Sequence, residues 1–272
     1  MTATDRPPST IGVAEMLRAS GELAAPDNGS VGLAGRPLRL LRALDATFLS
    51  WAEELGAEEW RFPAMISRAT LESVDFFSGF SHLATSATPI EERGQNVGEQ
   101  MLSTAVCFHL YPQFAGQVLP GSGPILRTAA GECYRYESGM EPLRRQWAFT
   151  MREIVFLGTP EEVESHRRAL MARTCDFARR LQLDSSLDVA TDPFFTAAGR
   201  GRALLQRIKE LKYELHVGDL AVASFNNHEA FFGRAFDFHL EDGRPAHSGC
   251  VAFGLERWVY ALMDRHGMDF EF

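Results

Sequence analysis

The chain has 272 residues, of which 45% are hydrophobic, 23% charged and 11% aromatic, so it is a folded globular protein and not a disordered tail, a collagen-like repeat or a coiled-coil rod. Lys and Arg number 27 and Asp and Glu 36, a net charge of −9, which offers nucleic acid or an anionic membrane no attractive whole-chain field. The four cysteines lack CxxC spacing and no signal peptide precedes them, which predicts free thiols in a reducing compartment, the cytoplasm. The chain has no uncharged apolar run of about 18 residues, so no membrane-spanning helix is predicted.

The first 35 residues differ from the remainder of the chain. They mix Pro, Ser, Gly and Asn with one short periodic stretch over residues 11–23, which is typical of a segment without its own core. We therefore predict a loosely ordered leader over residues 1–35 and a single domain over residues 36–272. Apolar residues then recur every three or four positions from Pro37 until Gly56, which predicts a long amphipathic helix ending at a glycine.

The next predicted elements are shorter. The segment WRFPAMI, residues 60–66, contains Pro63 and predicts a short edge strand, because proline cannot donate a hydrogen bond to a sheet. Ser67 suits the N-cap of a helix that runs to Phe77.

Two long strands are predicted after a Gly/Pro-rich turn at residues 120–124. In GECYRYES, Cys133, Arg135 and Glu137 alternate with tyrosines, so a strand would place these three residues on one face. A loop separates this segment from WAFTMREIVFLG, whose β-branched and aromatic residues predict a returning strand. Glu153 is a single carboxylate in an otherwise apolar row of that strand, and a buried charge there needs a partner.

The C-terminal half contains further helix and strand signals. The string TPEE predicts a helix that begins after Thr159 and runs to about Leu181. A basic helical stretch is expected over residues 199–212. Three strands are expected after it, over residues 213–217, 221–225 and 232–240. A last helix is predicted between Gly254 and Gly267.

Three segments resemble the signature motifs of class II aminoacyl-tRNA synthetases of the seryl type. CYRYESG, LRRQWAF and the strand after them resemble motif 2, around residues 131–157. CVAFGLERWVYALM resembles motif 3, around residues 250–266, and the helix followed by WRFPAMI resembles motif 1, around residues 58–67. The motifs occur in the expected order, which implies an α+β fold with an antiparallel β-sheet flanked by helices, and a homodimer formed through motif 1.

Two departures from the seryl pattern narrow the resemblance. Seryl-type enzymes carry a long N-terminal coiled-coil arm that grips tRNA, whereas only residues 1–35 precede the predicted catalytic core here. Val106 and Cys107 also follow a Thr-Ala pair after which ordinary seryl enzymes place a glutamate. Such a core is similar to the amino acid:[carrier protein] ligases, which use ATP to load a small amino acid onto the phosphopantetheine thiol of a carrier protein. The resemblance implies glycine or alanine as the substrate and no tRNA partner.

A zinc-dependent variety of the seryl type uses Cys, Glu and Cys as ligands, and the matching positions are Cys107, Glu153 and Cys250. Their spacings of 46 and 97 residues are too long to predict a Zn²⁺ site by themselves, but the isolated Glu153 fits one. Two thiolates and a carboxylate would leave one coordination position for the α-amino group of the substrate. The alternative is that both cysteines are small buried hydrophobes and Glu153 pairs with an arginine across the sheet. Cys133 and Cys175 are assigned to the core.

The same resemblance assigns charged residues to ATP. It implies that Arg135 contacts the α-phosphate and the amino-acid carboxylate, and that Glu137 lies on the adenine side. Arg145 would contact the phosphates and Arg257 the γ-phosphate. Catalysis by Arg135, Glu137 and Arg257 would be mainly positioning and charge neutralisation. The plain alternative is a cross-strand ion pair and a solvated arginine.

Two strand residues complete the implied ATP site. Glu214 in KYELHV and Ser224 in ASFNN match residues that hold Mg²⁺ and ATP in the seryl type. The implied reaction forms an aminoacyl adenylate and pyrophosphate, and the aminoacyl group then passes to a thiol. No protein nucleophile is needed, because the adenylate is already a good acyl donor.

A carrier protein of this kind is acidic, so a chain of net charge −9 needs a local basic patch to receive it. The basic stretch supplies the candidate docking residues Arg200, Arg202, Arg207 and Lys209; the alternative is a solvated helix face. Two other functions stay open. One is a tRNA-charging enzyme whose tRNA-binding part is supplied elsewhere, and the other is a non-catalytic regulatory or binding paralogue.

Overall fold

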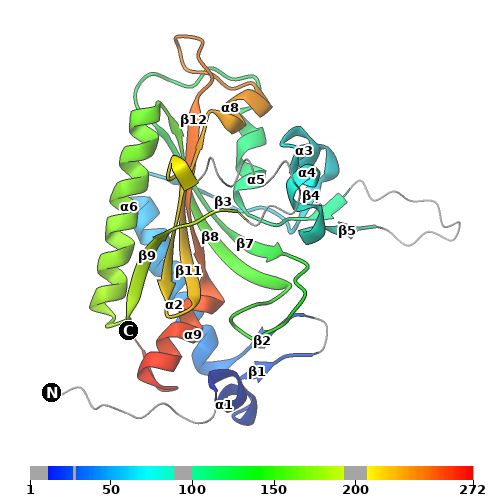
Figure 1. The fold of residues 1–272 in the computed structure, drawn as a ribbon, viewed down its shortest axis with the longest axis vertical. Coiled ribbons are helices and arrows are strands. Elements are labelled where there is room, and N and C mark those ends of the chain that lie inside the picture. Colours follow the sequence, from blue (N-terminus) through cyan, green and yellow to red (C-terminus); the bar gives the residue numbers. More distant parts are fainter. Residues whose placement is uncertain (1–11, 27–28, 89–99, 193–206, 272) are drawn as a thin grey trace, which may run out of the picture.

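The computed structural model describes residues 12–26, 29–88, 100–192 and 207–271. A seven-stranded sheet forms its centre (Figure 1). In spatial order its strands are β3 (Glu58–Trp60), β7 (Ile125–Tyr134), β8 (Ala148–Gly158), β12 (His247–Gly254), β11 (Leu220–Glu229), β10 (Lys212–Val217) and β9 (Ser185–Val189). β3 pairs with β7 in parallel and the other neighbours pair antiparallel. The predicted α+β fold with an antiparallel sheet flanked by helices is confirmed.

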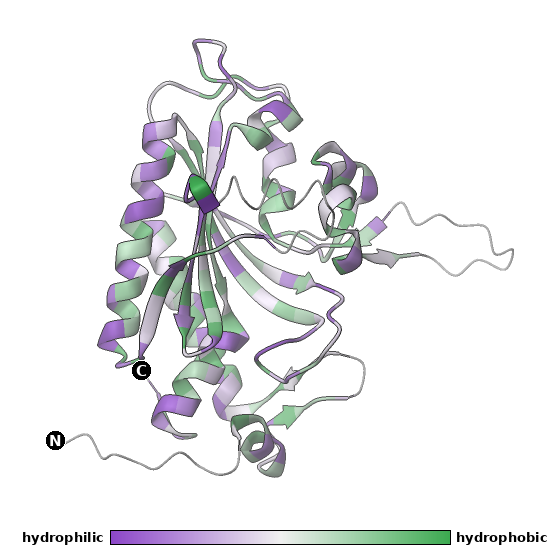
Figure 2. Cartoon of the chain, in the orientation of Figure 1, coloured by the Kyte–Doolittle hydropathy of each residue, from purple (hydrophilic) through white to green (hydrophobic). Residues whose placement is uncertain are grey.

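Three long helices pack on one face of the sheet. They are α2 (Gly35–Glu54), α6 (Pro160–Arg180) and α9 (Leu255–His266). Alternate residues of the central strands, such as Ile154 and Phe253, belong to the buried cluster beneath these helices. The ring of Phe48 on α2 stacks on that of Phe253, with 3.9 Å between the centroids. Hydrophobic and hydrophilic residues alternate along α6 (Figure 2), because one side of the helix meets the sheet and the other meets solvent.

The ends of these helices follow the predicted signals. Thr159 and Glu162 exchange side-chain and backbone hydrogen bonds, so a complete capping box begins α6. α2 ends before Gly56, and α9 begins after Gly254 and ends before Gly267. Within the described ranges, no helix is both long and apolar enough to cross a bilayer.

Shorter elements cover part of the opposite face. They are α3 (Arg68–Ser73), α4 (Phe76–Phe80), η1 (Ser81–Leu83), α5 (Cys107–Leu110), η2 (Tyr111–Phe114), α8 (Phe231–Phe236) and a three-stranded sheet in the order β4 (Met65–Ser67), β6 (Gln100–Leu102) and β5 (Thr85–Ala87). Their apolar side chains form a second buried cluster with Val155 and Leu157 of β8. This cluster borders the face of the sheet that carries the candidate site, and it includes Cys107 and Cys250.

Two predicted strands are wrong in part. Residues 60–66 do not form one strand, because the chain leaves the large sheet after Trp60 and joins the small sheet at Met65. Residues 232–240 begin in α8 instead of a strand. Phe232 lies four residues before Phe236 and stacks on it, with 6.4 Å between ring centroids. A short apolar run does not by itself distinguish helical from strand spacing.

The helix predicted from Ser67 is shorter than expected. Ser67 is the N-cap, since its hydroxyl accepts a hydrogen bond from the backbone N–H of Thr70. The helix ends at Ser73, and α4 follows after Asp75, which has a positive φ of 52°. One predicted helix is therefore two.

The described part of residues 1–35 is packed and not loose, which corrects the predicted leader. It forms α1 (Val13–Ala19) and a hairpin of β1 (Leu23–Ala24) and β2 (Gly32–Leu33). Val13, Leu17 and Leu23 are buried in the large cluster beneath α2 and α9. Burial of these few apolar side chains is enough to fix a segment of polar composition. Residues 1–11 and 27–28 lie outside the described residues.

Candidate active site

Two neighbouring rows of side chains cross the face of the sheet opposite α2, α6 and α9. Strand register places in the first row Glu153, Ala252, Ser224 and Glu214. The second row joins Val155, Cys250, Asn226 and Lys212. Directly paired residues share one face of a sheet. The strands therefore bring together residues that are far apart in sequence, such as Glu153 and Ala252, which are 99 positions apart. Glu153, Ser224, Glu214 and Cys250, all predicted as site residues, lie on this face.

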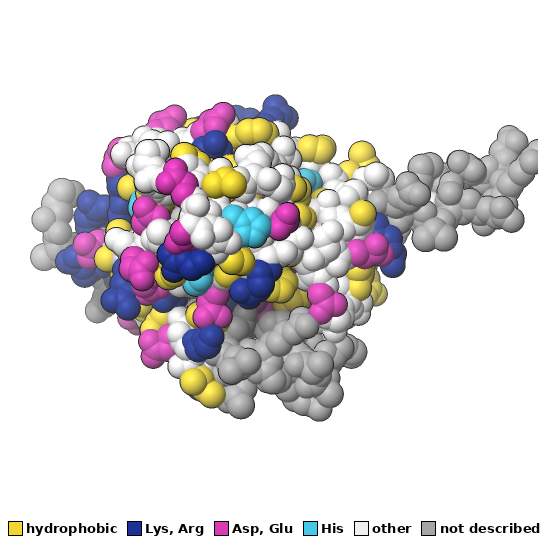
Figure 3. Space-filling view, turned by 90° about the horizontal axis from the view of Figure 1, so that it is seen from above, with side chains coloured by type: hydrophobic (Ala, Val, Ile, Leu, Met, Phe, Trp, Pro, Cys, Tyr) yellow, Lys and Arg dark blue, Asp and Glu magenta, His cyan; other side chains and the backbone are white. Residues whose placement is uncertain are grey.

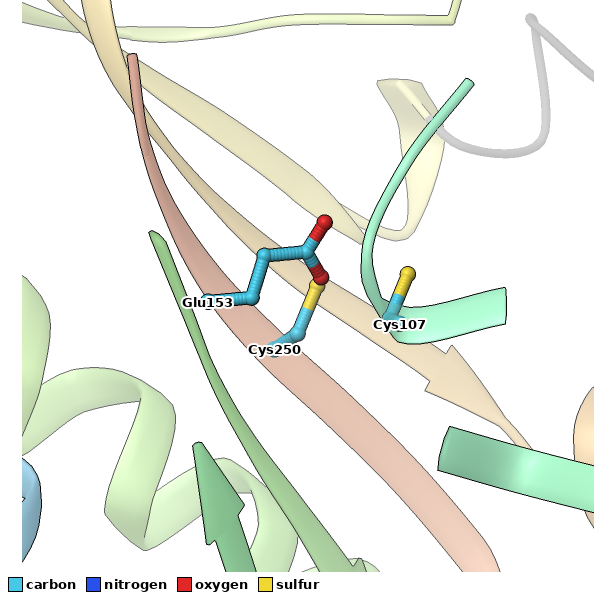
Figure 4. Close-up of side chains that lie close together, drawn as sticks. All are labelled: Cys107, Glu153 and Cys250. Carbon is cyan, nitrogen blue, oxygen red and sulfur yellow. The ribbon is translucent and has the colours of Figure 1, made fainter. Parts of the chain in front are cut away.

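The Sγ atoms of Cys107 and Cys250 and a carboxylate oxygen of Glu153 lie within 4.8 Å of one another. The three residues are 6%, 3% and 1% exposed, respectively. In Figure 4, Glu153 and Cys250 project from the neighbouring strands β8 and β12, and Cys107 approaches from the start of α5. The backbone N–H of Val106 donates to Glu153 Oε1 over 3.1 Å. The other oxygen, Oε2, has no hydrogen-bond partner among the described residues.

This donor set fits a divalent metal ion better than it fits a purely apolar core. Burial raises the pKa of Glu153 above its ordinary value, because a lone carboxylate loses hydration there. The hydrogen bond with Cys250 and burial raise the pKa of Cys107. A bound cation would favour the deprotonated forms and give Glu153 Oε2 a partner. Two thiolates and one carboxylate are ligands that Zn²⁺ accepts.

The arginine alternative for Glu153 does not match the structure. Arg152, its neighbour on β8, points to the other face of the sheet and binds Asp45 and Glu59. Arg135 lies near enough to lower the pKa of Glu153 electrostatically, a smaller influence than burial. No ion pair joins Glu153 to an arginine within the ranges that the structure describes.

Two further residues contact Cys250 and a third contacts one of these two, and the sequence pattern indicated none of the three. Asn226 Nδ2 lies 3.5 Å from Cys250 Sγ and His228 Nε2 lies 3.9 Å from it. The hydroxyl of Tyr111 lies 3.1 Å from His228 Nδ1. Burial lowers the pKa of His228 to about 4, so this imidazole is neutral near pH 7. When Tyr111 donates to Nδ1, the proton on Nε2 faces the sulfur. The available signal was the alternation of Ser224, Asn226 and His228 along one strand.

Arg135 lies just beyond the end of β7, which corrects the predicted strand through Glu137. The strand ends at Tyr134, and of the three predicted face residues it contains Cys133 alone. The backbone N–H of Arg135 still donates to the carbonyl of Trp147 over 2.8 Å. Its Nε donates to the carbonyl of Thr104 over 3.0 Å. The first bond fixes the backbone of Arg135 and the second orients its guanidinium through Nε, which leaves the N–H groups of Nη1 and Nη2 for an anion.

Arg257 occupies the first turn of α9 and is also held by backbone carbonyls. Its Nε donates to the carbonyl of Arg144 and its Nη1 to that of Ala221, over 2.8 and 2.9 Å. Burial lowers the pKa of Arg257, and the positive charge of Arg135 lowers it further. Arg135 and Arg257 are two positive charges close enough to repel each other, and a bound anion would relieve this repulsion.

The remaining predicted ATP residues lie within electrostatic range of Arg257. Glu214 and Glu137 raise its pKa and Arg145 lowers it, all less strongly than burial does. Arg145 is exposed and its side chain has no partner among the described residues. Its neighbour Arg144 binds Asp219 and Tyr260. The structure therefore places Arg135, Glu137, Arg145 and Glu214 within electrostatic range of Arg257.

A partly buried lysine adjoins Glu214. Lys212, expected at the end of the basic helix, instead begins β10 and lies in the second row. Its Nζ is 3.0 Å from Glu214 Oε1 and 2.8 Å from Asp192 Oδ1. Burial lowers the pKa of Lys212, but the two carboxylates outweigh burial and raise it. Glu214 therefore has a fixed positive neighbour that the sequence did not indicate.

The basic stretch is only partly described. Arg200 and Arg202 lie outside the described residues. Arg207 is exposed, and Lys209 Nζ lies 2.8 Å from Glu229 Oε1. On the face seen in Figure 3, basic and acidic side chains are interspersed. The described residues thus bring Arg207 and Lys209 to the surface but do not test the docking patch as a whole.

The structure resembles the catalytic cores of class II synthetases. The TM-score is 0.82 with M. kandleri SerRS from its complex with A. aeolicus tRNASec, over 96% of this chain and 59% of that one, at 24% identity. It is 0.75 with prolyl-tRNA synthetase from Cryptosporidium parvum, over 93% of this chain and 51% of that one, at 14% identity. These likenesses establish the class II fold.

Sequence comparison shows which proteins of this fold the chain is related to. No family model matches it. It is 31% identical to the type-2 serine–tRNA ligase of Methanocaldococcus jannaschii over 63% of this chain, but over only 35% of that enzyme. It is 33% identical to amino acid–[acyl-carrier-protein] ligase 1 of Bradyrhizobium diazoefficiens over 82% of this chain and 76% of that one, and 31% identical to ligase 2 over 89% and 80%. The chain therefore belongs to the family of amino acid–[acyl-carrier-protein] ligases and is a ligase.

Proposed function

We propose that this ligase activates a small amino acid with ATP and transfers it to the phosphopantetheine thiol of an acidic acyl carrier protein. The observation that carries the proposal is the closeness of the Cys107–Glu153–Cys250 cluster to the arginines and glutamates around Arg257, with Arg135 within electrostatic range of both Glu153 and Arg257. The first offers a place for an amino group and the second a place for triphosphate. The names of the Bradyrhizobium diazoefficiens relatives support the carrier protein as the acceptor.

In the first step, a carboxylate oxygen of the amino acid attacks the α-phosphorus of ATP and pyrophosphate leaves. Arg135 would bind the carboxylate and the α-phosphate, so the two reacting groups meet against one guanidinium. Arg257 would bind the γ-phosphate, and Arg145, in the motif 2 loop, would contact the phosphates. Glu137 would bind the adenine side. The rate gain comes from alignment and from neutralised phosphate charge.

Cys107, Glu153 and Cys250 would hold a zinc ion. Zn²⁺ bound by three protein ligands supplies a Lewis acid with an open position for a neutral amino group. The three residues then select an α-amino acid over a simple carboxylic acid. Glycine or alanine is the proposed substrate.

Glu214 and Ser224 would hold Mg²⁺ and ATP. The two residues are directly paired in the first row, so a carboxylate and a hydroxyl lie side by side there. In the second step, the carrier thiol loses its proton to solvent, its sulfur attacks the carbonyl carbon, and AMP leaves. We place Arg200, Arg202, Arg207 and Lys209 at the carrier interface. A homodimer through motif 1 and a cytoplasmic location, where thiols stay reduced, complete the proposal.

The test is amino-acid-dependent exchange of pyrophosphate into ATP, measured on zinc-loaded protein over all twenty amino acids. We expect exchange with one or two small amino acids, and its loss in Cys107→Ala and Arg257→Ala. Cys175→Ala is the matched control, since Cys175 lies on α6 behind the sheet. Folded, zinc-containing protein without exchange for any amino acid would refute the ligase mechanism and favour a binding paralogue.

The acceptor is tested separately. Protein that shows exchange is incubated with radiolabelled amino acid and either a phosphopantetheinylated carrier protein or bulk tRNA. Label on the carrier that is released by neutral hydroxylamine, which cleaves thioesters, supports the proposal. Label on tRNA alone would favour the tRNA-charging alternative.

A further inference from the structure

The N-terminal hairpin reaches the motif 2 loop. The carbonyl of Gly29, just before β2, accepts a hydrogen bond from the backbone N–H of Trp147 over 2.8 Å. Gly29 has a φ of 77°, and a Cβ placed on it would overlap Cγ and Cδ2 of the Trp147 side chain. Glycine is thus favoured at position 29 for two reasons: it adopts a positive φ without strain, and it has no Cβ to collide with Trp147.

Trp147 in turn fixes the residues on the opposite limb of motif 2. Its carbonyl accepts from the backbone N–H of Arg135, and its Nε1–H donates to the carbonyl of Glu137, each over 2.8 Å. Its ring contacts that of Tyr136, with 4.7 Å between centroids. Trp147 therefore holds both Arg135 and Glu137, the two residues after β7 that are proposed to bind ATP.

The hairpin itself is anchored to the body of the protein. Leu23 is buried, and Glu22 forms an ion pair with Arg36 at the start of α2. Arg36 also binds Asp269 near the C-terminus. The anchor matters because a mobile hairpin could not hold Trp147 in one place.

We propose that Gly29 and Trp147 form a positioning clamp that sets Arg135 and Glu137 for ATP. The inference rests on the proposed function, because it takes these two residues as nucleotide ligands. Neither clamp residue touches the reacting atoms. The clamp acts by keeping the backbone of residues 135–137 in one geometry before ATP arrives, which is what preorganised sites require.

The test compares Gly29→Ala with Gly21→Ala. Both glycines have a positive φ, near 75°, but a Cβ on Gly21 meets nothing within 4 Å. The two variants therefore carry similar backbone strain, and only one pushes on Trp147. In pyrophosphate exchange, we expect Gly29→Ala to raise the KM for ATP about tenfold or more. Gly21→Ala should keep the wild-type KM.

A second variant separates positioning from folding. Trp147→Phe keeps a ring and both backbone bonds but removes the Nε1–H that holds Glu137. We expect a raised KM for ATP with a circular dichroism spectrum and zinc content like those of the wild type. Hydrogen exchange of the Arg135 and Trp147 amides should be faster in Gly29→Ala than in Gly21→Ala.

Faster amide exchange with an unchanged KM for ATP would overturn the proposal, because the contact would then be structural only. An equal rise of KM in both glycine variants would also overturn it. Wild-type protein that exchanges no pyrophosphate refutes the proposed function instead. In that case, the affinity for ATP is measured by calorimetry for the wild type, Gly29→Ala and Gly21→Ala. Weaker binding in Gly29→Ala alone would support the clamp, and equal binding in both variants would overturn it.

Discussion

The two halves of the candidate site meet at Arg135, which acts electrostatically on both Glu153 and Arg257, but they are held in different ways. Glu153 and Cys250 are strand residues whose side chains are almost fully buried. Arg135 and Glu137 follow the end of a strand, and Arg257 opens a helix. Carbonyls of neighbouring segments hold the side chains of Arg135 and Arg257, and the Nε1–H of Trp147 holds the carbonyl of Glu137. The metal half therefore depends on side-chain chemistry, whereas the nucleotide half depends on backbone placement. Substitutions should separate the two.

The largest effect is expected from Glu153→Gln. The amide keeps the shape of the side chain and an acceptor for the N–H of Val106, but it is a poor ligand for zinc. Metal analysis should show zinc affinity more than about a hundredfold weaker, and exchange should fall to background. The melting temperature of metal-free protein should not fall, because burying a carboxylate costs more than burying an amide. The exposed Glu132→Gln is the control; a fall in apo stability confined to Glu153→Gln would contradict this view.

Arg257→Lys should leave the metal half intact and damage the nucleotide half. Lysine cannot reach the carbonyls of Arg144 and Ala221 with a planar fork and still offer donors to phosphate. We expect kcat/KM for ATP to fall about a hundredfold to a thousandfold, with zinc content unchanged. Arg265→Lys, on the exposed end of the same helix, should have no such effect. Loss of zinc in Arg257→Lys would show that the halves are not separable.

His228→Gln should have a smaller effect, limited to the metal half. The imidazole lies between Cys250 and Tyr111, so its loss removes an N–H donor from the sulfur side. Zinc affinity, measured by chelator competition, should weaken about tenfold to a hundredfold. His266→Gln, on the far end of α9, is the control. The KM for ATP of the zinc-saturated variant should stay at the wild-type value, and a rise would tie His228 to the nucleotide half.

The smallest effect concerns the anchor of the N-terminal hairpin. The hydrogen bond from Arg36 lowers the pKa of Glu22 from its ordinary value of 4.5 to about 2. A lowered pKa in the folded state means that this stabilisation is full above pH 4.5 and is lost as the pH falls toward 2. Proteolysis of the hairpin should therefore accelerate over that interval, and less so in Glu22→Gln, which lacks the titrating group. Equal pH profiles for both proteins would disprove the link.

Much of the fold was predictable because its signals are local. The capping box at Thr159, the glycine after α2 and the β-rich segment around Glu153 each act within a few residues. Resemblance to ordered motifs then supplied the class of fold. The errors arose where spacing was ambiguous or distant packing decided, as in α8 and in the helix from Ser67.

The candidate site was only partly predictable. Arg135 and Glu137 were expected on a strand face, but the strand ends at Tyr134 and Trp147 holds them instead. Asn226, His228 and Lys212 were missed, because their importance comes from their contacts with Cys250 and Glu214 in the folded chain. The docking patch at Arg200 and Arg202 stays a prediction.

The sequence alone determined the order of the long helices and of the central strands, the acidic balance and the identity of the cysteines, glutamates and arginines available for chemistry. Tertiary structure decided which of them meet. Cys107 and Cys250 are separated by more than 140 residues, and their approach to Glu153 follows from antiparallel register and from the packing of α5 on β8. Only folding brings such distant groups together, because a ligand site needs positions in space and the sequence fixes only positions along the chain.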